Sequence, residues 1–275
     1  LSLLSLYRKM SRDVFIISYP CSGRTWLRLM IGRAFMLAEG LDTDRIWELH
    51  TMPMMKGGKR LPRVILGHDQ EPFTKKPHEI AFDRRYFAGR KLIFLARDPR
   101  DLIVSWYFEQ LKRGVRSGGV DYQTFHGPIN DFVDLETGSI DTIIAFFNGW
   151  IEHHDGLSDF LLIRYEDLHH QPEAELHRCL EFCGYAGASE KIISAAVEFA
   201  SFDNMRTMEQ NGTLDWDTFQ PGANDDERSF KTRQGQVGDH RTHLSPESCD
   251  RIDRKVRERL DSRFGYETPG GRIVV

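Results

Sequence analysis

The segment YPCSGRTWLRLM, residues 19–30, has the layout of an anion-binding turn. It follows the apolar run VFIIS and leads into a helix-forming stretch. A strand, a short glycine-bearing loop and a helix present backbone N–H groups and the positive end of a helix dipole to an anion. The nucleotide-kinase pattern GxxxxGK[ST] is absent, because no lysine precedes Thr25. We therefore expect a different anion here; an ordinary strand-to-helix turn is the alternative.

Two further polar segments follow apolar runs. HDQE at 68–71 comes after RVILG, and RDPR at 97–100 ends the run KLIFLAR. Ligands of parallel α/β sheets bind at the carboxyl ends of the strands. These two segments and the loop 19–26 are therefore expected to form one site.

The apolar runs and helical segments that must position this site alternate along the chain. Strands are predicted at 13–18, 63–67, 91–97 and 160–165. Helices are predicted at 24–38, from DPRD onwards with Asp98 as its cap, and at 139–154, 172–183, 189–199 and 246–260. This alternation predicts an α/β fold: a doubly wound parallel sheet flanked by helices, with a P-loop-like strand-loop-helix at 13–38.

Composition narrows the class of protein. The 275 residues suit one domain over 1–275, and the formal net charge of −4 argues against general nucleic-acid binding. The apolar runs are shorter than the ~18 residues needed to span a bilayer, and the opening LSLLSLYRKM is too short for a secretory signal. We expect a cytoplasmic protein with free thiols. Because no HExxH or comparable spacing occurs, we expect no metal.

The segment 113–138 is rich in glycine and polar residues, with scattered aromatic residues. Two interpretations are open. It could be a disordered connector, or a flexible lid that closes over a substrate.

Five segments together resemble the sulfotransferases that use 3′-phosphoadenosine 5′-phosphosulfate (PAPS). YPCSGRTW is similar to their 5′-phosphosulfate loop, usually YPKSGTTW, and ARDPRDLIVSWY is similar to their 3′-phosphate segment. IRYEDL and SFDNM resemble two segments around the adenine, and RQGQVGDHRTH resembles the family's RKGxxGDWKNH. Each match is weak alone, but all five occur in the family's order.

The resemblance implies which residues bind the donor. The 5′-phosphosulfate would lie in the first loop, at Cys21, Ser22, Gly23, Arg24, Thr25 and Trp26. The 3′-phosphate would contact Arg97, Ser105, Arg233, Gln234 and Gly235. Adenine would lie between or beside Trp26, Tyr165, Ser201, Phe202 and Met205. Ordinary alternatives stay open: Arg97 could instead pair with Asp98 or Asp101, and the aromatic residues could belong to the core.

The resemblance also points to the catalytic groups. His68 stands where the family has a histidine after its second strand, so it would remove the acceptor's proton; a loop histidine is the alternative. Two family lysines are replaced, by Cys21 and by Leu66. We hypothesise that Arg24, at a family threonine, supplies the missing cation. A covalent role for Cys21 is a rival hypothesis.

The implied reaction is transfer of the sulfuryl group from PAPS to a hydroxyl or amine of a small-molecule acceptor. No metal, nucleic acid or membrane is implied, and the oligomeric state is open. Acidic clusters such as LDWD and NDDE hint at a cationic acceptor, although solvated loops are the simpler interpretation. Two alternatives are a non-catalytic sensor of PAPS or of its desulfated product, and a P-loop phosphotransferase.

Overall fold

A parallel sheet forms the centre of the molecule. The computed structural model describes residues 13–40, 55–56, 59–60, 62–82, 84–113, 115–117, 120–122, 125–154, 157, 159–185, 187–213, 230, 232 and 235–269. The sheet has the order β4–β1–β5–β8, and every neighbouring pair is parallel. Its strands are β1 (Val14–Ser18), β4 (Val64–Gly67), β5 (Lys91–Ala96) and β8 (Asp159–Arg164). Each begins and ends within one residue of its predicted bounds, which confirms the α/β class.

Strand β1 joins two hydrophobic clusters because its side chains alternate between the faces of the sheet. Val14 and Ile16 pack into one cluster, and Phe15 and Ile17 pack into the other. Because β1 is buried on both faces, its first four residues are all apolar, and only the buried Ser18 at its end is polar.

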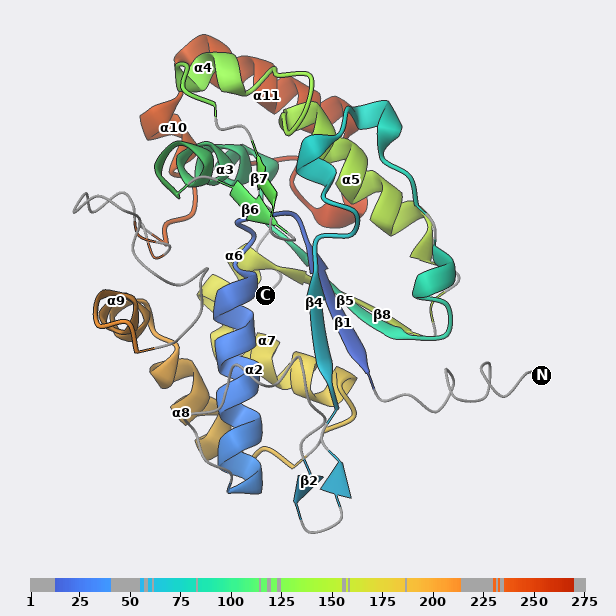
Figure 1. The fold of residues 1–275 in the computed structure, drawn as a ribbon, viewed down its shortest axis with the longest axis vertical. Helices are drawn as coiled ribbons and strands as arrows, with labels where there is room; N and C mark the ends of the chain where they lie inside the picture. The colour runs from blue at the N-terminus through green and yellow to red at the C-terminus, as the bar shows by residue number, and fades with distance from the viewer. Residues whose placement is uncertain are drawn as a thin grey trace.

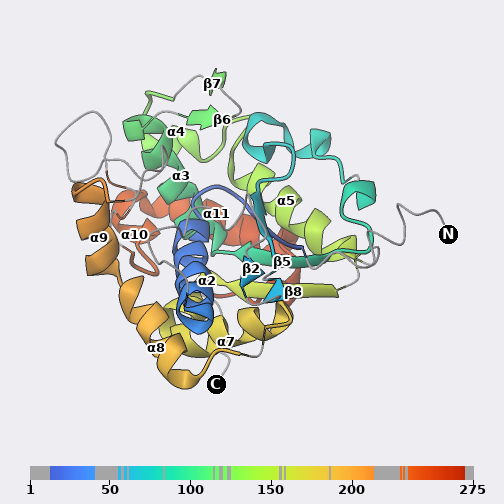
Figure 2. The same ribbon diagram turned by 60° about the horizontal axis from the view of Figure 1, so that its bottom comes forward.

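Helices cover both faces of the sheet (Figures 1 and 2). The first cluster is completed by α2 (Arg24–Glu39), α7 (Pro172–Phe182) and α8 (Glu190–Phe199). The second is completed by α3 (Pro99–Arg113), α5 (Ile140–Glu152) and α11 (Pro246–Arg259). None of the helices in the described part of the chain is both long enough and apolar enough to cross a membrane.

Helix α3 begins at the predicted cap. The Arg100 backbone N–H donates to Asp98 Oδ1 at 3.0 Å, and Pro99 occupies the first helical position. The Arg100 guanidinium also pairs with Asp98. Asp98 is therefore engaged in the cap of α3.

Several short elements were not predicted. They are α4 (Ile129–Phe132), α6 (Tyr165–His170), α9 (Phe202–Gln210), α10 (His240–His243), the hairpins β2 (Met55–Lys56)–β3 (Lys59–Arg60) and β6 (Val115–Ser117)–β7 (Val120–Tyr122), and the 3-10 turns η2 (Pro72–Thr74), η3 (Pro77–Glu79), η4 (Arg84–Tyr86) and η8 (Ser262–Phe264). One expectation is corrected: Tyr165 begins α6 and does not end the preceding strand.

The segment 113–138 contains the hairpin β6–β7 and α4. Phe132 and Val133 are buried in the second cluster, and the Tyr107 hydroxyl donates to the Gly127 carbonyl at 3.1 Å. The part from 125 onwards therefore packs against α3. A lid role for the segment stays a prediction.

Candidate active site

The loop between β1 and α2 has an unusual backbone. Cys21 and Gly23 both have a positive φ, of 67° and 95°. The Ser22 hydroxyl donates to the Tyr19 carbonyl at 2.9 Å, which helps to curl the loop. Among the described residues, no side chain caps the N-terminus of α2. The first backbone N–H groups of this helix have no intrahelical acceptor, so they suit an anion.

Two features favour glycine at position 23: its positive φ and the closeness of the Tyr165 ring. A Cβ at this position would lie 2.6 Å from Tyr165 Cδ2. Tyr165 is buried at the carboxyl end of β8, so the aromatic ring of a distant segment packs directly on the loop. A side chain at position 23 would displace either the ring or the loop.

Arg97 lies beside the same loop. Its Nη1 donates to the Cys21 carbonyl at 3.0 Å, and its guanidinium carbon lies 4.4 Å from the centre of the Tyr165 ring. Burial disfavours its charge, but the electrostatic effects of Tyr165, Asp101 and Glu166 raise the pKa of Arg97 above its ordinary value. The structure thus brings a buried cation to the carboxyl ends of β1 and β5.

His68 and Arg24 contact each other at the end of β4. Arg24 Nη2 lies 2.8 Å from His68 Nε2, and Arg24 Nη1 donates to the Gly67 carbonyl at 2.6 Å. His68 Nδ1 lies 2.8 Å from the Ser18 carbonyl. Burial lowers the pKa of Arg24 to about 10, which leaves it cationic at neutral pH. The two residues expected to be catalytic are therefore direct neighbours.

Asp101 fastens the C-terminal segment to α3. Its carboxylate accepts hydrogen bonds from the backbone N–H groups of Gly238 at 2.6 Å and His240 at 3.1 Å, and from His240 Nδ1 at 2.7 Å. Ser105 lies one turn further along the same helix, so it shares the face of Asp101. A Cβ on Gly235 would lie 2.9 Å from the Phe202 ring. The segment 235–240 thus runs between α3 and the start of α9.

The remaining residues expected near adenine divide into two groups. Trp26 and Tyr165 contact each other edge to face, with ring centres 5.8 Å apart, and the Phe202 side chain is 42% exposed. Met205, in contrast, packs in the first hydrophobic cluster, and the Ser201 hydroxyl accepts from the Asn204 N–H as the cap of α9. The first group could stack on a base, whereas the second has structural contacts here.

The hydroxyls expected at the 5′-phosphate are not equally available. Ser22 Oγ uses its one proton toward Tyr19, so a phosphate contact from this group needs a rotation. Thr25 is the second residue of α2.

Arg233 and Gln234, which were expected at the 3′-phosphate, lie outside the described residues. Within the residues that the structure describes, no group of three or more His, Cys, Asp or Glu side chains is arranged to hold a metal.

A family profile described as "Sulfotransferase domain" matches residues 11–263. The chain belongs to the sulfotransferase domain family. Cytosolic sulfotransferase 10 of Arabidopsis thaliana is 30% identical to it, over 92% of this chain and 80% of that protein. The amine sulfotransferase of Oryctolagus cuniculus is 24% identical, over 90% of this chain and 80% of that protein. A crystal structure of mouse sulfotransferase SULT7A1 complexed with PAP matches with a TM-score of 0.59 and 17% identity, over 90% of this chain and 86% of that one.

Sequence reasoning named Asp101 only as an alternative partner of Arg97, and it did not single out His240 in this candidate site. Both side chains are 1% exposed, and hydrogen bonding to His240, together with the charge of Arg97, holds the pKa of Asp101 below its ordinary value despite burial. The available signal was that Asp101 precedes Ser105 by four residues, which places both on one helix face. Nothing in the chain order shows that His240, 139 residues away, is the partner.

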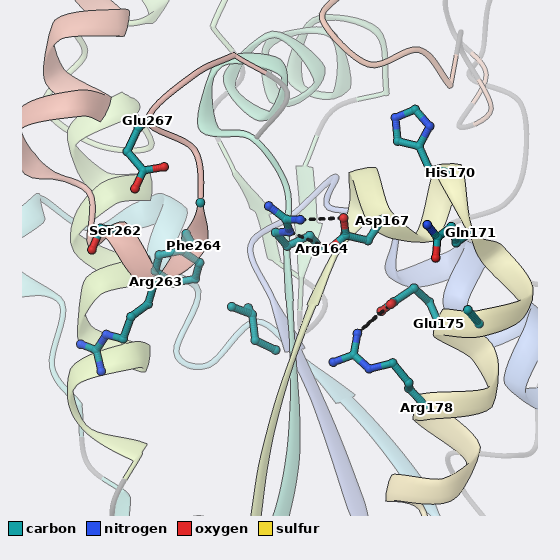
Figure 3. A pocket seen from close by; sticks show the side chains of 13 residues that line it. Arg164, Asp167, His170, Gln171, Glu175, Arg178, Ser262, Arg263, Phe264 and Glu267 are labelled. Carbon is teal, nitrogen blue, oxygen red and sulfur yellow. Dashed lines mark hydrogen bonds and ion pairs between the residues drawn. The ribbon is translucent and has the colours of Figure 1, made fainter. Parts of the chain in front are cut away.

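A pocket of about 560 Å³ lies between β8, α6, α7 and η8, and contains none of the predicted site residues (Figure 3). Two pairs of its charged side chains bind each other, whereas Glu267 Oε2 is buried without a hydrogen-bond partner among the described residues. Arg164 binds Asp167 at 2.6 Å and 2.7 Å, and Arg178 binds Glu175 at 2.7 Å. Because none of the predicted site residues lines this pocket, it is a weaker candidate for the active site than the anion-binding loop.

Glu166 contacts Asp98, the residue that follows Arg97 in the chain. Its Oε1 accepts from the Asp98 N–H at 2.9 Å, and its Oε2 accepts from the Tyr266 hydroxyl at 2.6 Å. Burial, helped by the charge of Asp98, raises the pKa of Glu166 to about 7. The ionised form is therefore disfavoured in the folded protein.

Glu166→Gln should change how stability depends on pH. As pH rises from about 4.5 through about 7, the unfolded wild type loses this proton first, so the wild type loses stability that the variant keeps. We expect the stability of the variant relative to wild type to rise by about 3 kcal/mol between pH 4 and pH 8. Urea unfolding at both pH values measures this, with exposed Glu258→Gln as control. An unchanged difference would contradict the raised pKa.

Proposed function

We propose that this sulfotransferase transfers the sulfuryl group of PAPS to a hydroxyl or amine of a small molecule. The observation that carries the proposal is the hydrogen bond from Arg97 Nη1 to the Cys21 carbonyl at 3.0 Å. It joins the two segments that would bind the separate anionic ends of one adenine nucleotide. The solved mouse relative is complexed with PAP, the desulfated form of this donor, which supports the same assignment.

The donor would lie across the carboxyl ends of β1 and β5. Its 5′-phosphosulfate would accept hydrogen bonds from the N–H groups at the start of α2, aided by the helix dipole. Its 3′-phosphate would be bound by Arg97 and Ser105, together with Arg233, Gln234 and Gly235. Its adenine would stack near Trp26 and Phe202.

The chemistry assigned to this site is a direct displacement. The acceptor oxygen or nitrogen attacks sulfur, and its proton passes to His68 Nε2. The bond from sulfur to the bridging oxygen breaks, and its electron pair stays on the 5′-phosphate of the product, 3′-phosphoadenosine 5′-phosphate (PAP). The products are a sulfate ester or sulfamate and PAP.

The growing negative charge needs a cation, and Cys21 cannot provide one. Two unit charges ~4 Å apart interact by about 4 kcal/mol at an effective dielectric of 20. Arg24 is the cation that we assign to this task, because it begins α2 and keeps its charge in spite of burial. Backbone N–H groups of the loop assist it.

Transfer from radiolabelled PAPS to a panel of phenols, alcohols and amines tests the function. We expect a labelled product and stoichiometric PAP. Binding of PAP without transfer to any acceptor would favour the non-catalytic sensor, and thermal stabilisation by ATP but not by PAP would favour a phosphotransferase. The name of the rabbit relative, an amine sulfotransferase, puts amines in the panel, and the name of the Arabidopsis relative supports the expected cytoplasmic location.

Arg97→Gln should weaken PAP binding by roughly 10- to 150-fold, because a charge-assisted hydrogen bond contributes about 1.5–3 kcal/mol. AMP, which differs from PAP only in lacking the 3′-phosphate, should bind with an unchanged Kd. Isothermal titration calorimetry with both nucleotides measures the effect. An equal loss for AMP would show that Arg97 acts through the loop and not on the 3′-phosphate.

A further inference from the structure

The contacts of His68 define where its protons are. His68 Nδ1 lies 2.8 Å from the Ser18 carbonyl, and a carbonyl can only accept, so Nδ1 carries a hydrogen and donates it. His68 Nε2 lies 2.8 Å from Arg24 Nη2, which can only donate, whereas the contact of Arg24 Nη1 with His68 Nδ1 is longer, at 3.3 Å, and joins two donors. The imidazole is therefore neutral, and its one lone pair accepts from Arg24.

This arrangement prevents His68 from acting as a base. A general base must direct a free lone pair at the proton that it removes. With Nδ1 protonated, Nε2 is the only nitrogen that could accept that proton, and Arg24 covers it. Arg24 must move before the acceptor can be activated.

The acceptors of Arg24 in this arrangement are neutral. Arg24 Nη1 donates to the Gly67 carbonyl and also lies 3.3 Å from His68 Nδ1, and Nη2 donates to His68 Nε2. Arg28 adds positive charge nearby: burial and the charge of Arg24 lower the pKa of Arg28 to about 10. An anion at the start of α2 would attract Arg24 more strongly than a carbonyl and a neutral imidazole do.

We propose that Arg24 blocks Nε2 of His68 until the 5′-phosphate end of the donor draws the guanidinium away. The inference rests on the proposed function and adds a second role to Arg24. In the donor-free protein Arg24 blocks the lone pair of His68 Nε2, and in the donor complex the same side chain stabilises the leaving group. Proton removal is consequently ordered, because His68 can deprotonate the acceptor only after the donor has bound.

Nitrogen NMR of protein labelled with ¹⁵N-histidine tests this. The His68 signals are assigned from the spectrum of His68→Asn. Addition of PAP should move the Nε2 signal to the position of a neutral imidazole without a hydrogen-bond donor, while Nδ1 keeps its proton. Adenosine 3′-monophosphate, which lacks the 5′-phosphate, should leave the Nε2 signal where it is.

Two variants complete the test. Arg24→Met should show the unblocked Nε2 signal without any nucleotide, and Arg178→Met, on α7, should respond to PAP as wild type does. PAP binding, measured by thermal stabilisation, without movement of the Nε2 signal would overturn the blocking role and leave the sulfotransferase proposal standing. An equal shift with adenosine 3′-monophosphate would also overturn it. No binding of PAP would instead overturn the proposed function, and the inference with it.

Discussion

His68→Asn should lower kcat by roughly two to four orders of magnitude, because positioned general bases contribute about 10²- to 10⁴-fold. The asparagine amide can still donate to the Ser18 carbonyl, which His68 Nδ1 contacts at 2.8 Å in the wild type, so the end of β4 should keep its shape. The KM for PAPS should change little. Steady-state kinetics with the acceptor found in the screen measure both constants.

The control for this variant is His170→Asn, since His170 is exposed and lies in the pocket between β8 and α7. It should retain full activity. A His68→Asn enzyme with wild-type kcat would show that His68 is only a loop residue. A rise in KM with no change in kcat would place His68 in substrate binding and not in proton transfer.

Gly23→Ala should weaken PAP binding by roughly two orders of magnitude, about 3 kcal/mol. The added Cβ would lie 2.6 Å from the Tyr165 ring, and φ at this position is 95°, a conformation that costs an L-residue about 1–2 kcal/mol. Because Tyr165 also lies under the Arg97 guanidinium, a displaced ring disturbs both anion-binding segments. Calorimetric titration with PAP measures the loss.

Gly89→Ala separates the effect of backbone strain from the effect of the clash with the Tyr165 ring. Gly89 has a φ of 72°, but a Cβ there would meet nothing within 4 Å. This variant should therefore lose some stability through backbone strain and still bind PAP normally. If Gly23→Ala binds PAP as well as Gly89→Ala does, the contact between the loop and the Tyr165 ring has no part in donor binding.

The strands were predictable because burial on both faces requires a run of apolar residues, which is visible in the sequence. Residues 14–17 pack into two hydrophobic clusters at once, so each of these four positions is apolar. The cap of α3 was predictable for a similar reason, because Asp98 followed by Pro99 meets the needs of a helix N-terminus locally.

The contacts within the site were not predictable in the same way. The pairing of Arg24 with His68 depends on the rotamer of a long side chain and joins residues 44 positions apart. The pairing of Asp101 with His240 spans 139 positions. Neither leaves a periodic pattern. Tyr165 was assigned to the wrong element because only Arg164 separates it from the apolar run FLLI, although the backbone turns into α6 at this residue.

The link between Arg97 and the first loop runs through a main-chain oxygen, that of Cys21. The identity of the side chain at position 21 is consequently irrelevant to this bond. Serine or alanine at this position would keep the carbonyl that Arg97 contacts, so changes of the side chain at position 21 should preserve the link between the two segments that would bind the nucleotide.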